Sequence, residues 1–358
     1  MNTPLPTLSS AGLQRFLGLR RDAVDSVAER FYAEHGGIYA AFGPRGRDAC
    51  REDLGFHLEF LQPVLEFGLL DPIVDYLRWL GSVLATRGIP VSHVPQSLDW
   101  LAEFFAERMD AADAQIVIAV LRQAKEKSQQ TAEFASGIEA KAPEAWPECS
   151  AFEQALLAGD RREAIAIVER CLVDGRDLIA AELHIIQPAL YRIGRKWQNN
   201  EVSVAQEHLA TAIAQSVMSL GLMKTEPASP IGKRVLLACV EGNRHAVGLQ
   251  MVADAYQLSG WDVQFLGADV PTAALVGQVL EWKPHLVGLS ISFAHQLPVV
   301  RKVMVRLQEA LGNARPPVII GGLAINHFDA LAGQVGAEGW GPDAAAAVAS
   351  GTVLAGGQ

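Results

Sequence analysis

Four apolar runs of strand length follow one another in the last third of the chain, separated by segments with helical spacing. They are Arg234–Val240, Val263–Leu266, Leu286–Ser292 and Pro317–Ile320. Strand-length runs that alternate with helices predict a parallel sheet with helices on both faces. Right-handed crossovers bring the binding groups of such a sheet to the carboxyl ends of its strands, so we expect the functional residues of this part there.

Two segments with two prolines each, Lys141–Ser150 and Lys224–Lys233, divide the chain into three parts. Such clusters interrupt periodic structure and indicate domain boundaries. We therefore predict a multidomain α plus α/β protein. It would consist of a globin-like helical domain over residues 1–140, a four-helix bundle over 150–225 and a flavodoxin- or Rossmann-like domain over 230–358.

Apolar residues recur at helical spacing through the first two parts. In the first part the expected helices are Arg20–His35, Arg47–Phe67, Asp71–Arg87, Ser97–Met109 and Ala111–Phe134. Pro63 is expected to bend or divide the second of them. In the second part, Asp160 is expected to cap a helix that ends at Gly175, and two longer helices are expected over Asp177–Trp197 and Val202–Met223.

Charge and cysteine use limit the partners of the chain. The 358 residues include 30 basic and 40 acidic side chains, a net charge of -10, and the longest basic runs are pairs such as Arg20-Arg21. Such a chain repels a phosphate backbone, so we predict no direct nucleic-acid binding. The apolar runs are shorter than the ~20 residues that span a bilayer, no signal-peptide pattern is present and the four cysteines are scattered. We expect a cytoplasmic protein without a membrane partner.

His245 stands in the loop that follows the first strand run, within the segment Glu241–Gly248. Asn243 precedes it by two residues and is expected to accept a hydrogen bond from one ring nitrogen, which leaves the other free for a metal. Gly248 would let a bulky, flat ligand approach the start of the next helix. From the spacing alone, an exposed histidine in a polar loop is an equal alternative.

This loop resembles the D-x-H-x-x-G signature of cobalamin-binding domains. In that family the histidine is the lower axial ligand of cobalt, which implies that role for His245. The segment Leu266–Pro271, which includes Gly267 and Val270, matches the loop after the second strand of the family. Small residues that would accommodate the nucleotide tail follow the third and fourth runs: Ser290, Ser292, Gly321 and Gly322. The aspartate of the family is Asn243 here, which implies a less polarised imidazole.

Trp197 is followed, after nine residues, by Glu207-His208. The spacing resembles the cap of CarH-type and LitR-type photoreceptors, which bind adenosylcobalamin. The resemblance implies that Trp197 packs against the adenosyl group, with Glu207 and His208 beside it. These photoreceptors commonly carry a histidine directly after the tryptophan; here that residue is Gln198, so cobalt capture by this position is not expected. Taken singly, a helix-end aromatic over a core and an exposed polar pair would explain the same residues.

Cys50, Asp53, His57 and Leu61 share one face of an expected helix, at offsets of three and four residues. The segment Cys50–Asp53 resembles the C-x-R-D helix of phycobiliproteins, in which the aspartate binds pyrrole N–H groups. The whole chain resembles photocobilins, which join a globin-like bilin-binding domain to a cobalamin-binding module. This implies that Cys50, Asp53, His57 and Tyr76 lie at a biliverdin site. A buried cysteine with a core histidine, and haem with His57 as axial ligand, are the alternatives.

Together these resemblances imply a light-sensing signalling protein rather than an enzyme, with adenosylcobalamin and biliverdin as chromophores. With neither a catalytic nor a DNA-binding domain expected, we predict output through a change of homo-oligomeric state or through a partner signalling protein. The main alternative is a corrinoid carrier protein of a methyltransferase system. Cobalamin storage or transport would explain the α/β part but not the cap.

Overall fold

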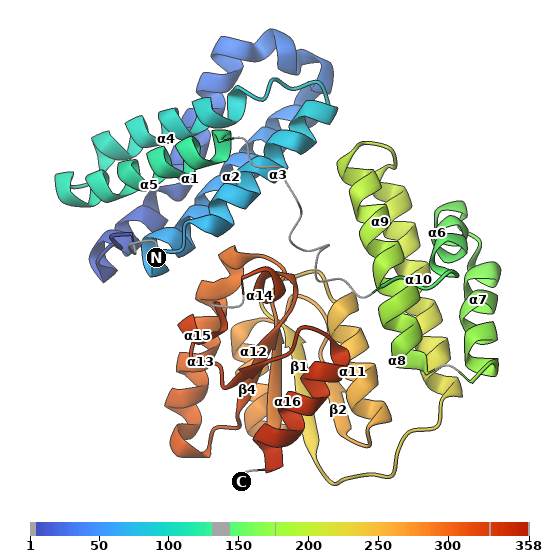
Figure 1. Cartoon of the computed structure of the whole chain (residues 1–358). Coiled ribbons are helices and arrows are strands. Elements are labelled where there is room, and N and C mark those ends of the chain that lie inside the picture. Colours follow the sequence, from blue (N-terminus) through green and yellow to red (C-terminus); the bar gives the residue numbers. More distant parts are fainter. Residues whose placement is uncertain (1–4, 131–143, 176, 329–330, 357–358) are drawn as a thin grey trace. The chain divides into compact units, whose positions relative to one another are not determined.

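The computed structural model describes residues 5–130, 144–175, 177–328 and 331–356 (Figure 1). The chain divides into two compact units, Met1–Ala135 and Ser136–Gln358. The described part of the first unit is helical, and the second unit combines a helical bundle with a five-stranded parallel sheet. The predicted class, helical parts joined to an α/β part, is confirmed.

The described residues of the first unit form five helices and a short 3-10 turn. They are α1 (Ser10–Tyr39), the turn Ala40–Phe42, α2 (Gly43–Phe67), α3 (Asp71–Thr86), α4 (His93–Arg108) and α5 (Ala111–Gln129). The first helix begins well before the expected Arg20, because the side chain of Ser9 caps it by accepting the N–H of Gly12 at 3.0 Å. Pro63 does not divide α2, since it is buried in the core, whose packing holds the helix together.

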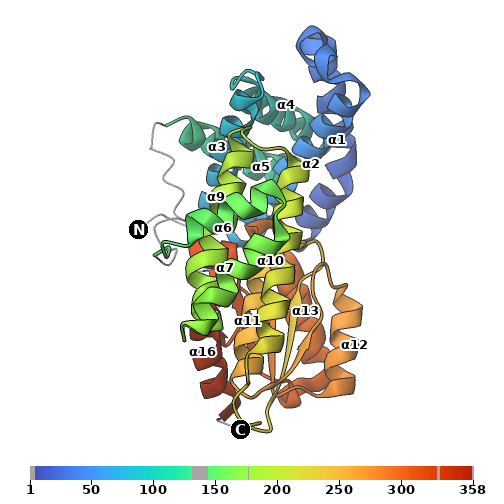
Figure 2. The same cartoon turned by 90° about the vertical axis from the view of Figure 1, so that its right-hand side faces the viewer.

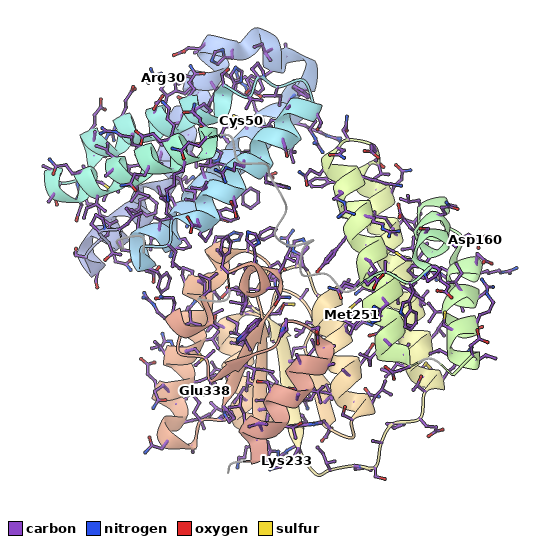
Figure 3. All side chains as sticks on the ribbon, in the orientation of Figure 1. Arg30, Cys50, Asp160, Lys233, Met251 and Glu338 are labelled. Atoms are coloured by element: carbon purple, nitrogen blue, oxygen red, sulfur yellow. The ribbon has the colours of Figure 1, made fainter. Side chains whose placement is uncertain are left out.

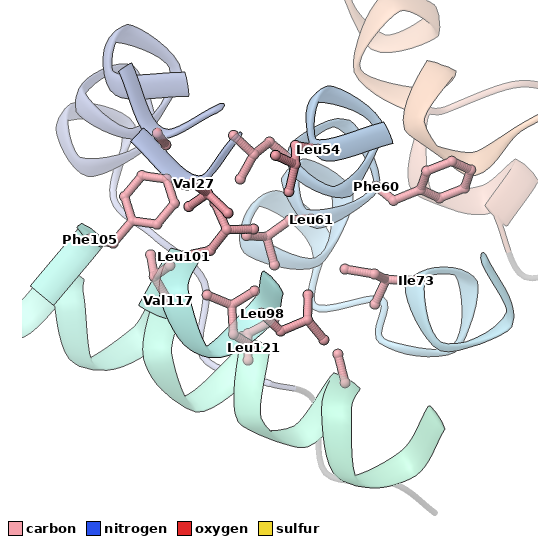
Figure 4. Close-up of a cluster of buried hydrophobic side chains, with 14 of the residues drawn as sticks. Val27, Leu54, Phe60, Leu61, Ile73, Leu98, Leu101, Phe105, Val117 and Leu121 are labelled. Atoms are coloured by element: carbon pink, nitrogen blue, oxygen red, sulfur yellow. The ribbon is translucent and has the colours of Figure 1, made fainter. Parts of the chain in front are cut away.

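The apolar faces of these helices meet in one core (Figure 4). Val27 of α1, Leu61 of α2, Leu101 of α4 and Leu121 of α5 are all less than 3% exposed. Burial of such side chains contributes about 1.5–3 kcal/mol each, and this is the main force that holds the unit together. In the described part of the chain, no helix is both long and apolar enough to cross a membrane.

The bundle of the second unit follows at residue 149. Its elements are α6 (Cys149–Ala158), α7 (Arg161–Val173), α8 (Leu178–Ala181), a π-helical turn (Glu182–Ile186), α9 (Gln187–Gln198) and α10 (Val204–Lys224). Asp160 caps α7 as expected, accepting the N–H of Glu163 at 3.0 Å. The single helix expected over Asp177–Trp197 is interrupted by the π-helical turn, a feature that sequence spacing does not reveal.

The sheet has the strand order β2-β1-β3-β4-β5, and all its pairs are parallel. The strands are β1 (Arg234–Cys239), β2 (Asp262–Phe265), β3 (Leu286–Ser290), β4 (Val318–Gly321) and β5 (Gly339–Trp340). This order is that of flavodoxin-like sheets, in which ligands bind where the strand order reverses, between β1 and β3. The helices between and after the strands are α11 (Val247–Leu258), α12 (Thr272–Trp282), α13 (Leu297–Leu311), α14 (Leu323–His327), α15 (Leu331–Gln334) and α16 (Ala344–Gly356).

The bundle and the α/β part share a core, because α11 packs against the bundle (Figure 2). Met251 and Ala255 of α11 belong to the same buried cluster as Ile185, Ala214 and Met218 of the bundle. Met251 is labelled in Figure 3 on the side of α11 that faces these helices. The bundle is therefore seated directly on the helix that follows the His245 loop.

Candidate functional site

The residues predicted after β1, β3 and β4 meet at one edge of the sheet. His245 lies in the loop between β1 and α11, Ser290 ends β3 and Gly321 ends β4. Parallel strands expose their carboxyl ends on the same side, which is why residues far apart in the sequence come together here. Val270 joins them through a parallel bridge to Val240.

Asn243 fixes the His245 loop through the backbone rather than through the imidazole. Its side chain is fully buried, its Nδ2 donates to the carbonyl of Ser290 at 2.8 Å, and its Oδ1 accepts the backbone N–H of His245 at 3.2 Å. The expected bond to the ring is thus replaced by a bond to the main chain. The bond to Ser290 explains why an amide side chain is present at position 243. A carboxylate only accepts hydrogen bonds, so it could not donate to the Ser290 carbonyl.

Two residues that the sequence did not single out clamp the peptide of Gly242 in this loop. Asp269 accepts the N–H of Gly242 at 2.7 Å, and Gln296 donates to its carbonyl at 3.1 Å. Gln296 is only 3% exposed, and its Oε1 also accepts the N–H groups of Ser292 and Phe293. The loop that carries His245 is therefore tied to the loops after β2 and β3.

The His245 side chain is exposed, and its ring meets that of Phe293 edge-on at 5.3 Å between centroids. Desolvation lowers the pKa of His245 below its ordinary value of 6.5, and the negative charge of Glu207 partly opposes this. The imidazole is therefore neutral at physiological pH, which is the form that binds a metal ion.

The glycines at this edge of the sheet are glycine for different structural reasons. Gly322 has φ = 97°, and a Cβ there would come within 2.3 Å of the carbonyl oxygen of Ile291, so the close approach of backbone requires glycine. Gly267 is held at φ = 79°, which favours glycine for the turn itself. At Gly248 a Cβ would meet nothing within 4 Å, so no protein atom demands glycine there. A small residue beside open space fits a flat ligand lying over the start of α11.

Trp197 and the pair Glu207-His208 lie at the same end of the bundle, on either side of the α9–α10 connection. Trp197 is half-buried near the end of α9, and Ser203 begins α10 through a capping box with Gln206. Glu207 pairs with Nδ1 of His208 and accepts the hydroxyl of Thr211 at 3.0 Å. The helix α10, which carries Glu207 and His208, also contacts α11, the helix that follows the His245 loop.

In the first unit, His57 and Tyr76 form a buried hydrogen-bonded group. Nδ1 of His57 lies 2.6 Å from the carbonyl oxygen of Asp53 and 3.0 Å from the hydroxyl of Tyr76, and its Nε2 lies 3.1 Å from the hydroxyl of Ser97. Burial lowers the pKa of His57 to about 4, so the ring is neutral. Both ring nitrogens are engaged, as expected of a core histidine, and a haem iron would have to displace Ser97 or break the bonds at Nδ1.

Cys50 and Asp53 lie beside this group on α2. Burial, followed by the charge of Asp53, raises the pKa of Cys50 to about 11, and burial raises the pKa of Asp53 to about 6. Cys50 is therefore a protonated thiol at neutral pH, a poor nucleophile for covalent attachment.

An open groove of about 570 Å³ lies on the neighbouring surface of α1 and α2. Its lining comes from Arg20, Arg21, Val24, Asp25, Asp48, Arg51 and Gly55. None of the four predicted bilin residues is among these described lining residues.

Comparisons with known proteins agree with the geometry of the second unit. Two family models described as B12 binding domains match the chain, one over residues 233–349 and the other over residues 149–220. The first covers the sheet and its helices, and the second covers most of the bundle.

Relatives of two kinds are similar to the chain. The HTH-type transcriptional repressor CarA of Myxococcus xanthus is 34% identical over 46% of this chain and 56% of its own length. CarH of the same organism is 30% identical over 41% of this chain and 48% of its own length. Dimethylamine corrinoid protein 2 of Methanosarcina mazei is 28% identical over 38% of this chain and 66% of its own length. The chain thus spans about half the length of the repressors, and its bundle and α/β domain are similar to B12 binding domains.

Proposed function

We propose that the chain is a light sensor that binds adenosylcobalamin between the bundle and the α/β domain. The observation that carries the proposal is the packing of the bundle on α11, the helix that begins two residues after His245. It links the tryptophan–glutamate–histidine pattern to the histidine expected to bind cobalt. The similarity to CarA and CarH supports the same assignment.

The residues at the site suit such a ligand. His245 presents a neutral imidazole from a loop held by Asn243 and Gln296, and the open space at Gly248 admits a flat ring. Adenosylcobalamin would supply a cobalt–carbon bond that light breaks. Trp197 would cover the upper ligand in the dark and lose that contact in light. A contact present in only one state gives the free-energy difference that a switch requires.

Absorption spectra of the full chain with adenosylcobalamin, recorded in the dark and after white light, test this proposal. We expect a histidine-ligated spectrum in the dark and a clear change after illumination; an unchanged spectrum would discard the light sensor. Trp197→Ala should alter the light response, whereas Trp282→Ala, on α12, should not. His245→Ala should abolish the nitrogen hyperfine splitting in the electron paramagnetic resonance of reduced cobalt.

The finer proposal is that the first unit binds biliverdin in the groove on α1 and α2. The groove presents Arg20 and Arg51, and guanidinium groups pair well with the propionates of a tetrapyrrole. Titration of the full chain with biliverdin should give a bound, red-absorbing band that Arg51→Ala weakens and Arg108→Ala, outside the groove, leaves intact. If no bound band forms, the bilin proposal fails and the cobalamin proposal stands.

A corrinoid carrier is the second candidate, favoured by the similarity to dimethylamine corrinoid proteins. It would bind methylcobalamin and transfer the methyl group in the dark with a partner methyltransferase. For the light sensor we instead propose output by a change of homo-oligomeric state or through a partner protein in the cytoplasm. Size-exclusion chromatography with light scattering, in the dark and in light, separates these outcomes.

A further inference from the structure

A buried glutamate of the bundle pairs with the end of the helix that carries Trp197. Glu153 of α6 is buried, and each of its carboxylate oxygens faces a cation of α9. Nζ of Lys196 lies 2.7 Å from Oε1 of Glu153, and Nη1 of Arg192 lies 3.7 Å from Oε2. Residues four apart lie on one face of a helix, so both cations belong to the face of α9 that is turned towards α6. Lys196 directly precedes Trp197 in the chain.

Glu153 is held in place because its neighbours on α6 are anchored in the core. Phe152 and Leu156 are both 0% exposed and belong to the cluster shared with α11. A buried carboxylate that loses its cations keeps a charge that water solvates poorly, so it holds them more firmly than an exposed acid would. Glu153 is therefore suited to fix the position of the Lys196 side chain.

Apolar packing does not reach the last turn of α9. The buried residues of this helix are Pro188, Ala189 and Ile193, and none of the described residues 194–198 is buried. Beyond Ile193, the position of the helix end therefore depends on partly exposed contacts, and the ion pair of Lys196 with Glu153 is one of them.

The backbone of Lys196 also organises the connection from α9 to α10. Its carbonyl accepts the N–H groups of Glu201 at 2.8 Å and Val202 at 3.4 Å. Directly after this loop, Ser203 caps α10, whose first turn carries Glu207. The side chain of Lys196 is thus tied to α6, while its carbonyl is tied to the loop that leads into α10.

We propose that Glu153 and Lys196 are positioning residues for Trp197: together they fix the last turn of α9 and the loop that follows it. Consecutive residues of a helix move together, so a last turn that rotates or frays at Lys196 also displaces Trp197. The inference rests on the proposed binding of adenosylcobalamin for what Trp197 covers, whereas the anchoring of the loop is a property of the chain alone.

Hydrogen–deuterium exchange of the full chain without cofactor tests the anchoring. In Lys196→Met and Glu153→Gln, peptides that contain residues 199–203 should exchange about fivefold faster, because an ion pair with one buried member is lost. Peptides of α7 should keep the rate of the wild type. Lys196→Arg retains the cation and should restore the loop to within about twofold of the wild type. Glu163→Gln is the matched control on an exposed pair, that of Glu163 with Arg170 at 3.0 Å, and should leave the loop unchanged.

The visible circular dichroism of bound adenosylcobalamin, recorded in the dark, is the second measurement. It depends on the groups around the corrin, so Lys196→Met should change it through the displacement of Trp197. Lys196→Arg and Glu163→Gln should each give the spectrum of the wild type. A general loss of bundle stability would not be rescued by retaining the cation alone.

An unchanged loop in Lys196→Met, or an equal acceleration of the loop and of α7, would overturn the anchoring. A faster loop with unchanged dichroism would overturn the role in placing Trp197. If the wild type binds no adenosylcobalamin, the proposed function fails and with it the role of Trp197, whereas the exchange of the loop still decides the anchoring. If Glu153→Gln does not fold, Lys196→Met, at a half-buried residue, decides the same question.

Discussion

Replacing Asn243 by aspartate restores the residue type typical of cobalamin-binding domains, yet we expect it to destabilise this one. The Nδ2 group of Asn243 is fully buried and donates to the carbonyl of Ser290 at 2.8 Å. In Asn243→Asp a carboxyl oxygen takes its place, and its desolvation beside a carbonyl should raise the pKa of the new carboxyl by about 3 units. At 1.4 kcal/mol per unit, the domain should lose about 4 kcal/mol of stability at pH 8.

The loss should depend on pH with a definite sign. A carboxyl whose pKa is raised by folding contributes its stability below the unfolded pKa and loses it as pH rises towards the folded pKa. At pH 4 the protonated group can donate to Ser290 as the amide does, so the loss should fall below about 1 kcal/mol. Urea unfolding of the full chain at pH 4 and pH 8, read by hydrogen exchange in peptides covering β1 and β3, measures both values.

Asn326→Asp is the matched control. The Nδ2 of Asn326 also donates to a carbonyl, that of Pro342 at 2.7 Å, but Asn326 is half-buried whereas Asn243 is fully buried. We expect a clearly smaller loss of stability there than in Asn243→Asp at pH 8. Equal stability of Asn243→Asp and the wild type at pH 8, or an equally large loss in the control, would refute the role of the buried amide.

Three further outcomes can be measured directly. Gly322→Ala should destabilise the domain by about 3 kcal/mol in urea unfolding, because φ = 97° and the carbonyl of Ile291 both exclude a Cβ, whereas Gly248→Ala should change stability by less than about 1 kcal/mol. Gln296→Ala removes three partly buried hydrogen bonds, so amide exchange in the 241–245 loop should accelerate about 30-fold, equivalent to about 2 kcal/mol, and an unchanged rate would contradict the role of Gln296. Alkylation of Cys50, whose pKa is raised to about 11, should be slow at pH 7 and rise about tenfold per pH unit up to that value; a fast reaction at pH 7 would contradict the buried thiol.

The sheet was predictable because its central strands are buried on both faces. After Arg234, the residues Val235–Cys239 of β1 are all buried and must be apolar, and this sets the strand apart from the amphipathic helices around it. The strand β5 could not be predicted, since its two residues, Gly339 and Trp340, form a strand only by pairing with Ile319 and Ile320 of β4. The π-helical turn likewise depends on packing against other helices rather than on local spacing.

The sequence predicted which residues lie at the site, but not which groups they hydrogen-bond to. The loop and His245 follow from their place after β1, but which group Asn243 binds depends on a carbonyl 47 positions away at Ser290. The bond of Gln296 to Gly242 spans 54 positions and left no local signal. His57 could be read as a core residue or a ligand until Ser97, 40 positions away, was placed against its Nε2.

The helix α11 connects the His245 loop rigidly to the bundle. Its 12 residues form a helix about 18 Å long that begins two residues after His245 and places Met251 and Ala255 in the core shared with the bundle. A helix of this length bends little, so a displacement of the His245 loop along the helix axis also displaces the residues of α11 that pack against the bundle. Substitutions halfway along α11 should therefore change how the His245 loop is positioned relative to the bundle.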